Sequence, residues 1–153
     1  MIKIVDYQIS HQKAFEELNK AWITQHFKLD KVDIEILSKP EEYIISKGGH
    51  ILIAKSDAEI VGTCALIKVA SVTYELSKMT IRDTYRGKGI GNLLMETVLE
   101  KAKIIGAKKL ELYTQKFLPE AINLYKKFGF QEILKETYKY SRADTYMVKL
   151  FGE

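Results

Sequence analysis

Residues 86–91 read Arg86-Gly87-Lys88-Gly89-Ile90-Gly91, a basic and glycine-rich turn between two regular segments. The apolar stretch before the turn ends at Ile81 and favours a strand. After the turn, apolar side chains recur every three or four residues as far as Ile105, which predicts an amphipathic helix over 89–105. A strand, a turn and a helix therefore follow one another at this point of the chain.

Such a turn is suited to bind an anion. The N–H groups of a helix's first turn have no partner within the helix, and the helix dipole adds partial positive charge there. Phosphate binds readily at this end of a helix. Glycines let the backbone approach an anion closely, while Arg86 and Lys88 add full charges. We expect a phosphorylated ligand here; the alternative is a glycine-rich helix cap that binds nothing.

The spacing of the glycines narrows the choice of ligand. A P-loop needs four residues between its first glycine and the Gly-Lys pair, followed by Ser or Thr, and this turn lacks them. The dinucleotide pattern G-x-G-x-x-G fails at its third position, which is Asn92. The spacing that fits is Arg-x-x-Gly-x-Gly, formed by Arg86, Gly89 and Gly91.

The N-terminal part of the chain has mostly helical patterns. An apolar run at 2–7 predicts an edge strand, and Ser10 is a candidate cap for a helix with its body at 13–27. A second helix is expected over 32–37, and a further helical turn opens at Pro40 and runs to Ile45.

The rest of the chain is rich in strand patterns. The strand at 59–69 is almost wholly apolar around Cys64, so it is predicted to be central and covered on both faces. Pro119 opens another helix, which ends at Gly129. Together with 2–7, the expected strands lie at 51–55, 59–69, 73–82, 109–113, 130–134 and 145–150. This order predicts one α/β (α+β) domain over 1–153, with a mostly antiparallel mixed sheet of six or seven strands flanked by about four helices.

Composition and charge argue against several classes of protein. The 24 basic and 20 acidic residues give a net charge of +4, but they are interleaved, so we do not expect a nucleic-acid-binding arm. Cys64 is the only cysteine, and the three histidines lack metal-ligand spacing, so we expect no metal. The N-terminus does not resemble a signal peptide, and no apolar stretch reaches the ~20 residues of a membrane helix. A cytoplasmic location is expected.

Two further blocks give the turn its context. The segment 75–81, Glu-Leu-Ser-Lys-Met-Thr-Ile, precedes it, and 124–130, Leu-Tyr-Lys-Lys-Phe-Gly-Phe, follows it. Together with the Arg-x-x-Gly-x-Gly spacing, these blocks resemble the fourth strand, pyrophosphate loop and last core helix of the GNAT acetyltransferases. The resemblance covers about residues 50–150, and it implies the GNAT fold and acetyl-CoA as co-substrate.

The resemblance implies where acetyl-CoA binds. Backbone groups at Met79, Thr80 and Ile81 would pair with the pantetheine arm, as an added strand pairs with a sheet edge. The pyrophosphate would lie on Arg86, Gly87, Lys88, Gly89, Ile90, Gly91 and Asn92. Many relatives also carry an asparagine near the start of the last helix, where this chain has Leu118. Gln115 or Asn123 would then have to replace it.

The resemblance also implies catalytic residues. Glu75 lies where many relatives carry a general base, which would act through a water; the alternative is an ordinary strand carboxylate. Tyr125 matches the tyrosine that protonates the leaving thiolate, and its ring can pack on the helix face at the same time. In this fold the first helices line the acceptor pocket, so Trp22 and His26 are candidate substrate contacts. Tyr140 and Arg142, in a basic and aromatic run, are further candidates for binding an acidic or polar acceptor.

Three functions remain open at this point. The first is an N-acetyltransferase that moves the acetyl group to a primary amine of a small molecule or peptide by direct attack in a ternary complex. The second is a catalytically silent sensor or subunit that binds acetyl-CoA, and the third a nucleic-acid-binding protein. The interleaved acids disfavour the third. The resemblance leaves a homodimer open and does not name the acceptor.

Overall fold

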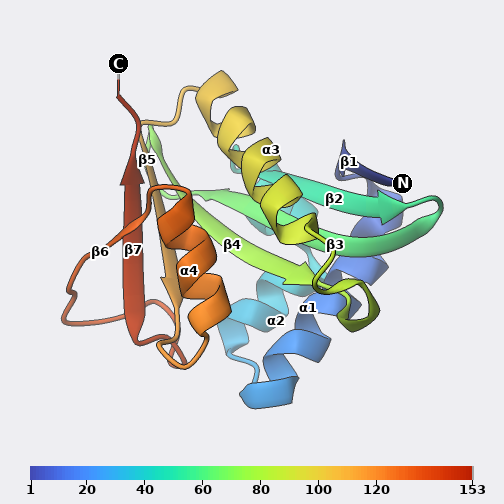
Figure 1. Cartoon of the computed structure of the whole chain (residues 1–153), viewed down its shortest axis with the longest axis horizontal. Helices are drawn as coiled ribbons and strands as arrows, with labels where there is room; N and C mark the ends of the chain where they lie inside the picture. Colours follow the sequence, from blue (N-terminus) through green and yellow to red (C-terminus); the bar gives the residue numbers. More distant parts are fainter. Residues whose placement is uncertain (153) are drawn as a thin grey trace.

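The computed structural model describes residues 1–152, and within them seven strands form one mixed sheet (Figure 1). The strand order is β1-β2-β3-β4-β5-β7-β6, and every neighbouring pair is antiparallel except β4 and β5. The strands are β1 (Ile2–Asp6), β2 (His50–Ser56), β3 (Glu59–Lys68), β4 (Thr73–Ile81), β5 (Lys109–Thr114), β6 (Gln131–Glu132) and β7 (Thr145–Leu150). The predicted fold class is confirmed.

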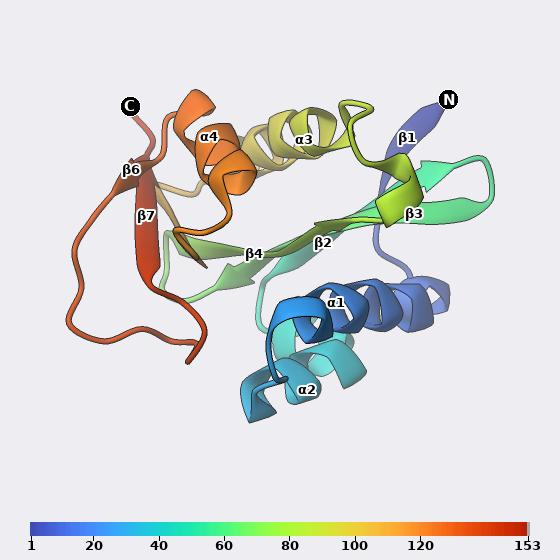
Figure 2. The ribbon, with the colours of Figure 1, turned by 60° about the horizontal axis from the view of Figure 1, so that its bottom comes forward.

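Two layers of helices cover the two faces of the sheet, as Figure 2 shows. On one face lie α1 (Gln12–His26) and α2 (Lys31–Ser38), followed by a π-type turn at Glu41–Ile45. On the other lie α3 (Ile90–Ile104) and α4 (Pro119–Lys127). Each layer encloses its own buried apolar cluster, one around Phe15 and Ile53, the other around Leu94 and Leu110. No helix in residues 1–152 combines the length and apolar composition of a membrane span.

Most element boundaries agree with the sequence predictions, and two do not. The central strand β3 is buried from Val61 to Ile67, as its apolar composition indicated. Ser10 does not cap α1, because it lies inside a short 3-10 turn and His11 takes the cap position without a side-chain bond. The expected strand at 130–134 is reduced to Gln131–Glu132, which pair with Val148 and Met147 of β7, and a single further backbone bond joins Ile133 to Tyr146.

Strand β4 contains a bulge that bends it. Thr63 pairs with Thr80 and Ala65 with Ser77, so two β4 residues, Lys78 and Met79, lie opposite one β3 residue. Lys78 has φ of 54°, in the left-handed region, which costs an ordinary residue about 1–3 kcal/mol. The surrounding structure must therefore hold it in place.

A buried chain of hydrogen bonds provides that support. The Thr63 hydroxyl donates to the carbonyl of Lys78 at 2.7 Å, and the Asn19 side-chain amide donates to Thr63 Oγ1 at 3.1 Å. The same amide donates to the carbonyl of Phe15, so the bulge is fastened to α1. The position of the bulge thus depends on contacts with a helix that lies far earlier in the chain.

We predict that Thr63→Val lowers the free energy of unfolding by about 1–3 kcal/mol, because Val keeps the shape but removes the hydroxyl that accepts from the Asn19 amide and donates to the Lys78 carbonyl. Urea unfolding at equilibrium measures the change. Thr97→Val is the matched control, since the Thr97 hydroxyl only bonds the carbonyl of Leu93 within α3. A loss no larger than that of Thr97→Val would contradict the role given to Thr63.

Candidate functional site

A cleft opens where β4 and β5 separate. The two strands pair only from Thr73–Glu75 to Lys109–Glu111 and then diverge. Beyond this point β4 stays bonded to β3, and β5 to β7. The resulting cleft has a volume of about 540 Å³ and is lined from both strands, from the turn before α3, and from α1 and α4.

The walls of this cleft present unpaired backbone. From Leu76 to Ile81 one edge of β4 faces the cleft instead of a neighbouring strand, and the same is true of β5 at Tyr113 and Thr114. Free N–H and C=O groups on a strand edge bind an extended segment by strand addition. The cleft is therefore suited to an extended ligand with its own amide groups.

The turn at 86–91 forms one end of the cleft. Gly87 and Gly89 have φ of 76° and 81°, and no atom lies within 4 Å of the position that a Cβ would take at either, so the backbone conformation is what requires glycine. Gly89 is the N-cap of α3, whose first helical bond runs from the N–H of Leu93 to the Gly89 carbonyl. The N–H groups of residues 90–92 precede that bond and have no partner within the helix.

Charged side chains surround the turn. Arg86 lines the cleft and pairs through Nε with Asp83 at 2.8 Å in an exposed ion pair. Lys88 is exposed and lies over the Tyr85 ring. Lys127, at the end of α4, donates to Asn92 Oδ1 at 2.7 Å and adds positive charge beside the first turn of α3. These groups and the helix dipole favour an anion at this end.

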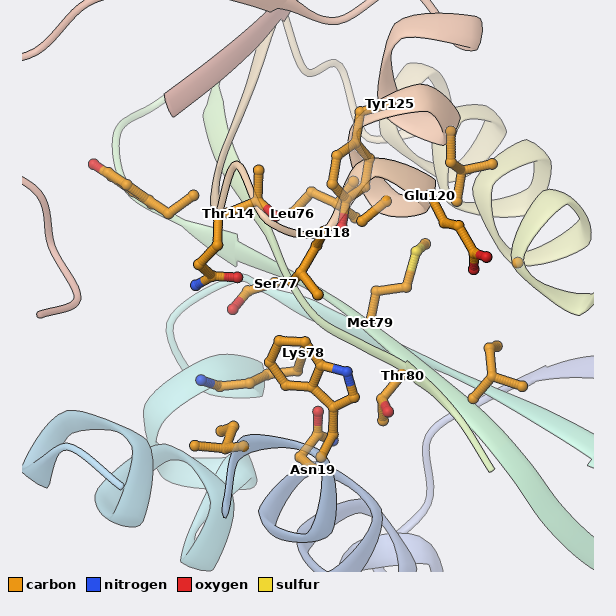
Figure 3. Close-up of a pocket in the computed structure, with 18 of the residues that line it drawn as sticks. Asn19, Leu76, Ser77, Lys78, Met79, Thr80, Thr114, Leu118, Glu120 and Tyr125 are labelled. Carbon is orange, nitrogen blue, oxygen red and sulfur yellow. The ribbon is translucent and has the colours of Figure 1, made fainter. Parts of the chain in front are cut away.

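Tyr125 projects from α4 into the cleft, with its hydroxyl directed toward β4 (Figure 3). Its ring packs edge-to-face on Phe130, with ring centroids 6.1 Å apart. Burial raises the pKa of the Tyr125 phenol above its ordinary value, so the hydroxyl keeps its proton at neutral pH. The side chain can thus both pack and donate a proton inside the cleft.

Glu75 lies at the point where the strands begin to separate. Its side chain is 1% exposed, and both carboxylate oxygens accept hydrogen bonds. Lys139 Nζ lies 2.6 Å from Oε1, and the Tyr140 hydroxyl donates to Oε2 at 2.9 Å. Both partners come from the loop between β6 and β7, which therefore closes over this end of the cleft.

A second buried carboxylate, Asp33, joins α2 to the same region. Lys78 Nζ donates to its Oδ1 at 2.8 Å, and Arg142 binds both oxygens through Nη1 and Nη2. Burial opposes ionisation of Asp33, but the hydrogen bonds and charges of Arg142 and Lys78 outweigh it, and the pKa of Asp33 lies below its ordinary value. Burial lowers the pKa of Lys78, against the attraction of Asp33.

The candidates from the sequence fall into two groups. Most of the residues predicted to bind the cofactor or the acceptor line this one cleft, as do both catalytic candidates. His26, Lys88 and Asn123 lie outside the lining. His26 is at the exposed end of α1, where its ring contacts Phe117, and Asn123 is on the exposed face of α4. Gln115, one of the two residues expected to replace the usual asparagine, lines the cleft, as does Leu118.

Sequence reasoning did not find the polar residues Asn19, Asp33, Lys78 and Lys139. Asn19 and Asp33 lie on apolar helix stripes, so a polar residue at a buried helical position was the available signal. Lys78 interrupts the alternation of β4 in the same way. Within residues 1–152, no three acidic, histidine or cysteine side chains form a cluster suited to a metal ion.

Comparison with known proteins identifies the family. The model of the acetyltransferase (GNAT) family matches residues 11–130, and the chain therefore belongs to that family. An uncharacterised N-acetyltransferase of Bacillus subtilis, YvbK, is 28% identical over 102 residues, which are 65% of this chain and 66% of that protein. The chain spans about half to two thirds of the length of the curated relatives it matches.

Solved structures support the same assignment. A GNAT-family acetyltransferase of Staphylococcus aureus Mu50 is 25% identical and superposes with a TM-score of 0.87, with 98% of this chain and 99% of the other covered. The structure of yncA from Salmonella typhimurium, with its cofactor acetyl-CoA, has a TM-score of 0.79 at 17% identity and covers 99% and 95% of the two chains.

We predict that Asp33→Asn lowers the free energy of unfolding at pH 7 by about 3–5 kcal/mol, because it leaves Lys78 buried without a counter-charge. Since the native pKa of Asp33 is depressed, its contribution is present above the unfolded pKa and is lost as the pH falls through the native value. The difference between wild type and variant should therefore shrink below about pH 4.

Urea unfolding at a series of pH values measures this difference. Asp6→Asn is the control, because Asp6 is mostly exposed and pairs with Lys101 at 3.4 Å, so its loss should cost less than about 1 kcal/mol. If the difference in the free energy of unfolding does not depend on pH, or is as small as that of the control, the buried Asp33 carboxylate does not stabilise the fold through its ion pairs.

Proposed function

We propose that the chain is an N-acetyltransferase that moves the acetyl group of acetyl-CoA to a primary amine. One observation carries the proposal: a cleft between unpaired strand edges leads from a phosphate-binding turn, past Tyr125, to Glu75. Its two ends and its walls match the parts of coenzyme A, namely a pyrophosphate and an arm that contains amides. The fold is shared with yncA, whose structure contains acetyl-CoA.

The residues present fit this ligand. The N–H groups of residues 90–92, with Arg86 beside them, would hold the pyrophosphate. The free edge of β4 at Met79, Thr80 and Ile81 would pair with the pantetheine amides. This arrangement directs the acetyl end toward Tyr125 and the bulge at Lys78. A backbone N–H of the same strand would polarise the thioester carbonyl.

The transfer requires one proton to leave the amine and one to reach the sulfur. Glu75, acting through a water, would accept the proton of the attacking amine. The amine nitrogen then forms a bond to the carbonyl carbon while the carbon–sulfur bond breaks. Tyr125 would donate its proton to the departing thiolate, and the phenol regains a proton from the amine side through solvent. The protonated state of Tyr125 at neutral pH suits this role.

A second candidate function rests on the state of Glu75. Its carboxylate already accepts from Lys139 and Tyr140, and these bonds compete with a catalytic water for its two oxygens. A protein in which this contact persists would bind acetyl-CoA without turnover, as a sensor or subunit. Thiol release from acetyl-CoA across a library of primary amines separates the two: turnover supports the transferase, while cofactor binding without turnover supports the sensor.

We predict that Tyr125→Phe lowers kcat on an accepted amine by about 10²–10⁴-fold, because the proton donor is lost. The dissociation constant of acetyl-CoA should stay within about twofold, since the ring still packs on Phe130. Thiol release from acetyl-CoA measures kcat, and calorimetric titration measures the dissociation constant of acetyl-CoA. Tyr138→Phe, in the loop between β6 and β7, should change neither. Unchanged turnover in Tyr125→Phe would remove this residue from the chemistry.

We predict that Gly91→Ala changes acetyl-CoA affinity and protein stability in opposite directions. Gly91 lies in the first turn of α3 without positive φ, and a Cβ there meets only Leu124 at an ordinary 3.6 Å. Alanine in place of a helical glycine should stabilise the protein by up to about 1 kcal/mol. The same methyl group would point at the bound phosphate, so we expect acetyl-CoA affinity to fall at least about tenfold.

Calorimetric titration and thermal unfolding of Gly91→Ala measure affinity and stability in parallel. Glu96→Ala, on the exposed face of α3, is the control and should leave affinity unchanged. Full affinity in Gly91→Ala would place the pyrophosphate elsewhere.

A further inference from the structure

Three charged side chains line the cleft at the end away from the phosphate-binding turn. These are Glu75, Lys78 and Arg142, and all three surround the ring of Tyr140. Lys78 Nζ lies 5.0 Å and Arg142 Cζ 4.7 Å from the centre of that ring, whose hydroxyl donates to Glu75. Two positive groups and one negative group of the lining are thus held within the dimensions of a single small molecule, while Lys139, which pairs with Glu75, does not line the cleft.

Lys78 and Arg142 each have N–H donors that the hydrogen bonds of the structure do not use. Lys78 is 2% exposed at its side chain, and an ammonium has three N–H donors, yet among residues 1–152 only Asp33 accepts from it. Arg142 uses Nη1 and Nη2 on Asp33 and Asp30, and these bonds leave its Nε–H free within the described part of the chain. Donors that remain unused beside a cleft favour a ligand with acceptor oxygens.

The carboxylates that pair with Lys78 and Arg142 lie on the side of these residues away from the cleft. Asp33 is fully buried on α2 and does not line the cleft. Asp30 is 3.5 Å from Arg142 and also accepts from the backbone and hydroxyl of Ser141. The surface that a ligand meets therefore carries two cations beside one carboxylate. Figure 3 shows Lys78 and Asn19 on the side of β4 that faces α1, across the strand from Tyr125.

We infer that the acceptor is an amine that also carries a carboxylate, as an amino acid does. This inference rests on the proposed acetyl transfer. The carboxylate of the acceptor would bind Lys78 and Arg142, and its amine would lie toward Glu75, on the path to the acetyl group. A diamine or polyamine would instead bring its second cation against Lys78 and Arg142, where like charges repel at short range.

Matched substrates test the inference on the unaltered protein. Each of several α-amino acids is compared with its own carboxamide and with butane-1,4-diamine, and kcat/KM is measured by thiol release from acetyl-CoA. Hydrogen bonds to charged groups contribute about 1.5–3 kcal/mol, so we expect at least about a tenfold preference for the acid. The carboxamide has the less basic amine and more of its neutral form, which works against this preference.

The possible outcomes separate the two proposals. If the carboxamide or the diamine is acetylated as well as the acid once kcat/KM is corrected for the neutral fraction of each amine, the inferred acceptor class is wrong while acetyl transfer stands. If no amine turns over although acetyl-CoA binds, the proposed transfer is wrong. Calorimetric titration of N-acetyl amino acids and their amides into the protein with coenzyme A then decides the carboxylate site. Binding of the acid at least about tenfold tighter supports the site, and equal binding overturns it.

A charge-removing variant distinguishes ligand binding from a purely structural role. Lys78→Gln keeps an N–H donor for Asp33 but removes the positive charge, so the acid-to-amide ratio should fall toward one. Lys101→Gln, on α3, is the control and should keep the wild-type ratio. An unchanged ratio in folded Lys78→Gln would assign Lys78 to structure alone. If that variant does not fold, the wild-type comparison still decides.

Discussion

The short pairing of β4 with β5 is the constraint on which the site depends. Three residue pairs join the strands, and the bulge at Lys78 lies beyond them. The bulge bends β4, and the Asn19–Thr63 hydrogen bonds hold it against α1. If β4 stayed paired with β5 to its end, no unpaired strand edge and no cleft would exist. A strained backbone position, supported from a distant helix, thus lies where the cleft opens.

The same bulge lies between the two ends of the cleft. On one side of β4 the free edge leads to the N-terminus of α3, where glycine conformation and the helix dipole favour phosphate. On the other side, the Lys78 side chain reaches Asp33 and Arg142, which connect α2 and the loop before β7. The end of the cleft proposed for the cofactor is built from backbone, and the end proposed for the acceptor from side chains of segments distant in sequence.

This difference explains what the sequence could predict. The turn at 86–91 is local, because its glycine spacing and the helix after it follow one another directly in the chain, and the structure places it as expected. The end proposed for the acceptor depends on Asp33, Lys78 and Arg142, which are far apart in sequence and meet only in the folded chain. The strand pattern of β4 also gave no sign of positive φ at a lysine. The cap expected at Ser10 is taken by His11, because residues 9–11 form a separate 3-10 turn before α1.

Amide hydrogen exchange with and without acetyl-CoA tests the central claim most directly. If the cofactor lies along the free edge of β4 with its pyrophosphate on α3, exchange should slow at residues 76–81 and 89–92. Strand β2, which is paired on both sides by β1 and β3, should not change. Protection confined to other segments, or no protection at saturating acetyl-CoA, would contradict the account.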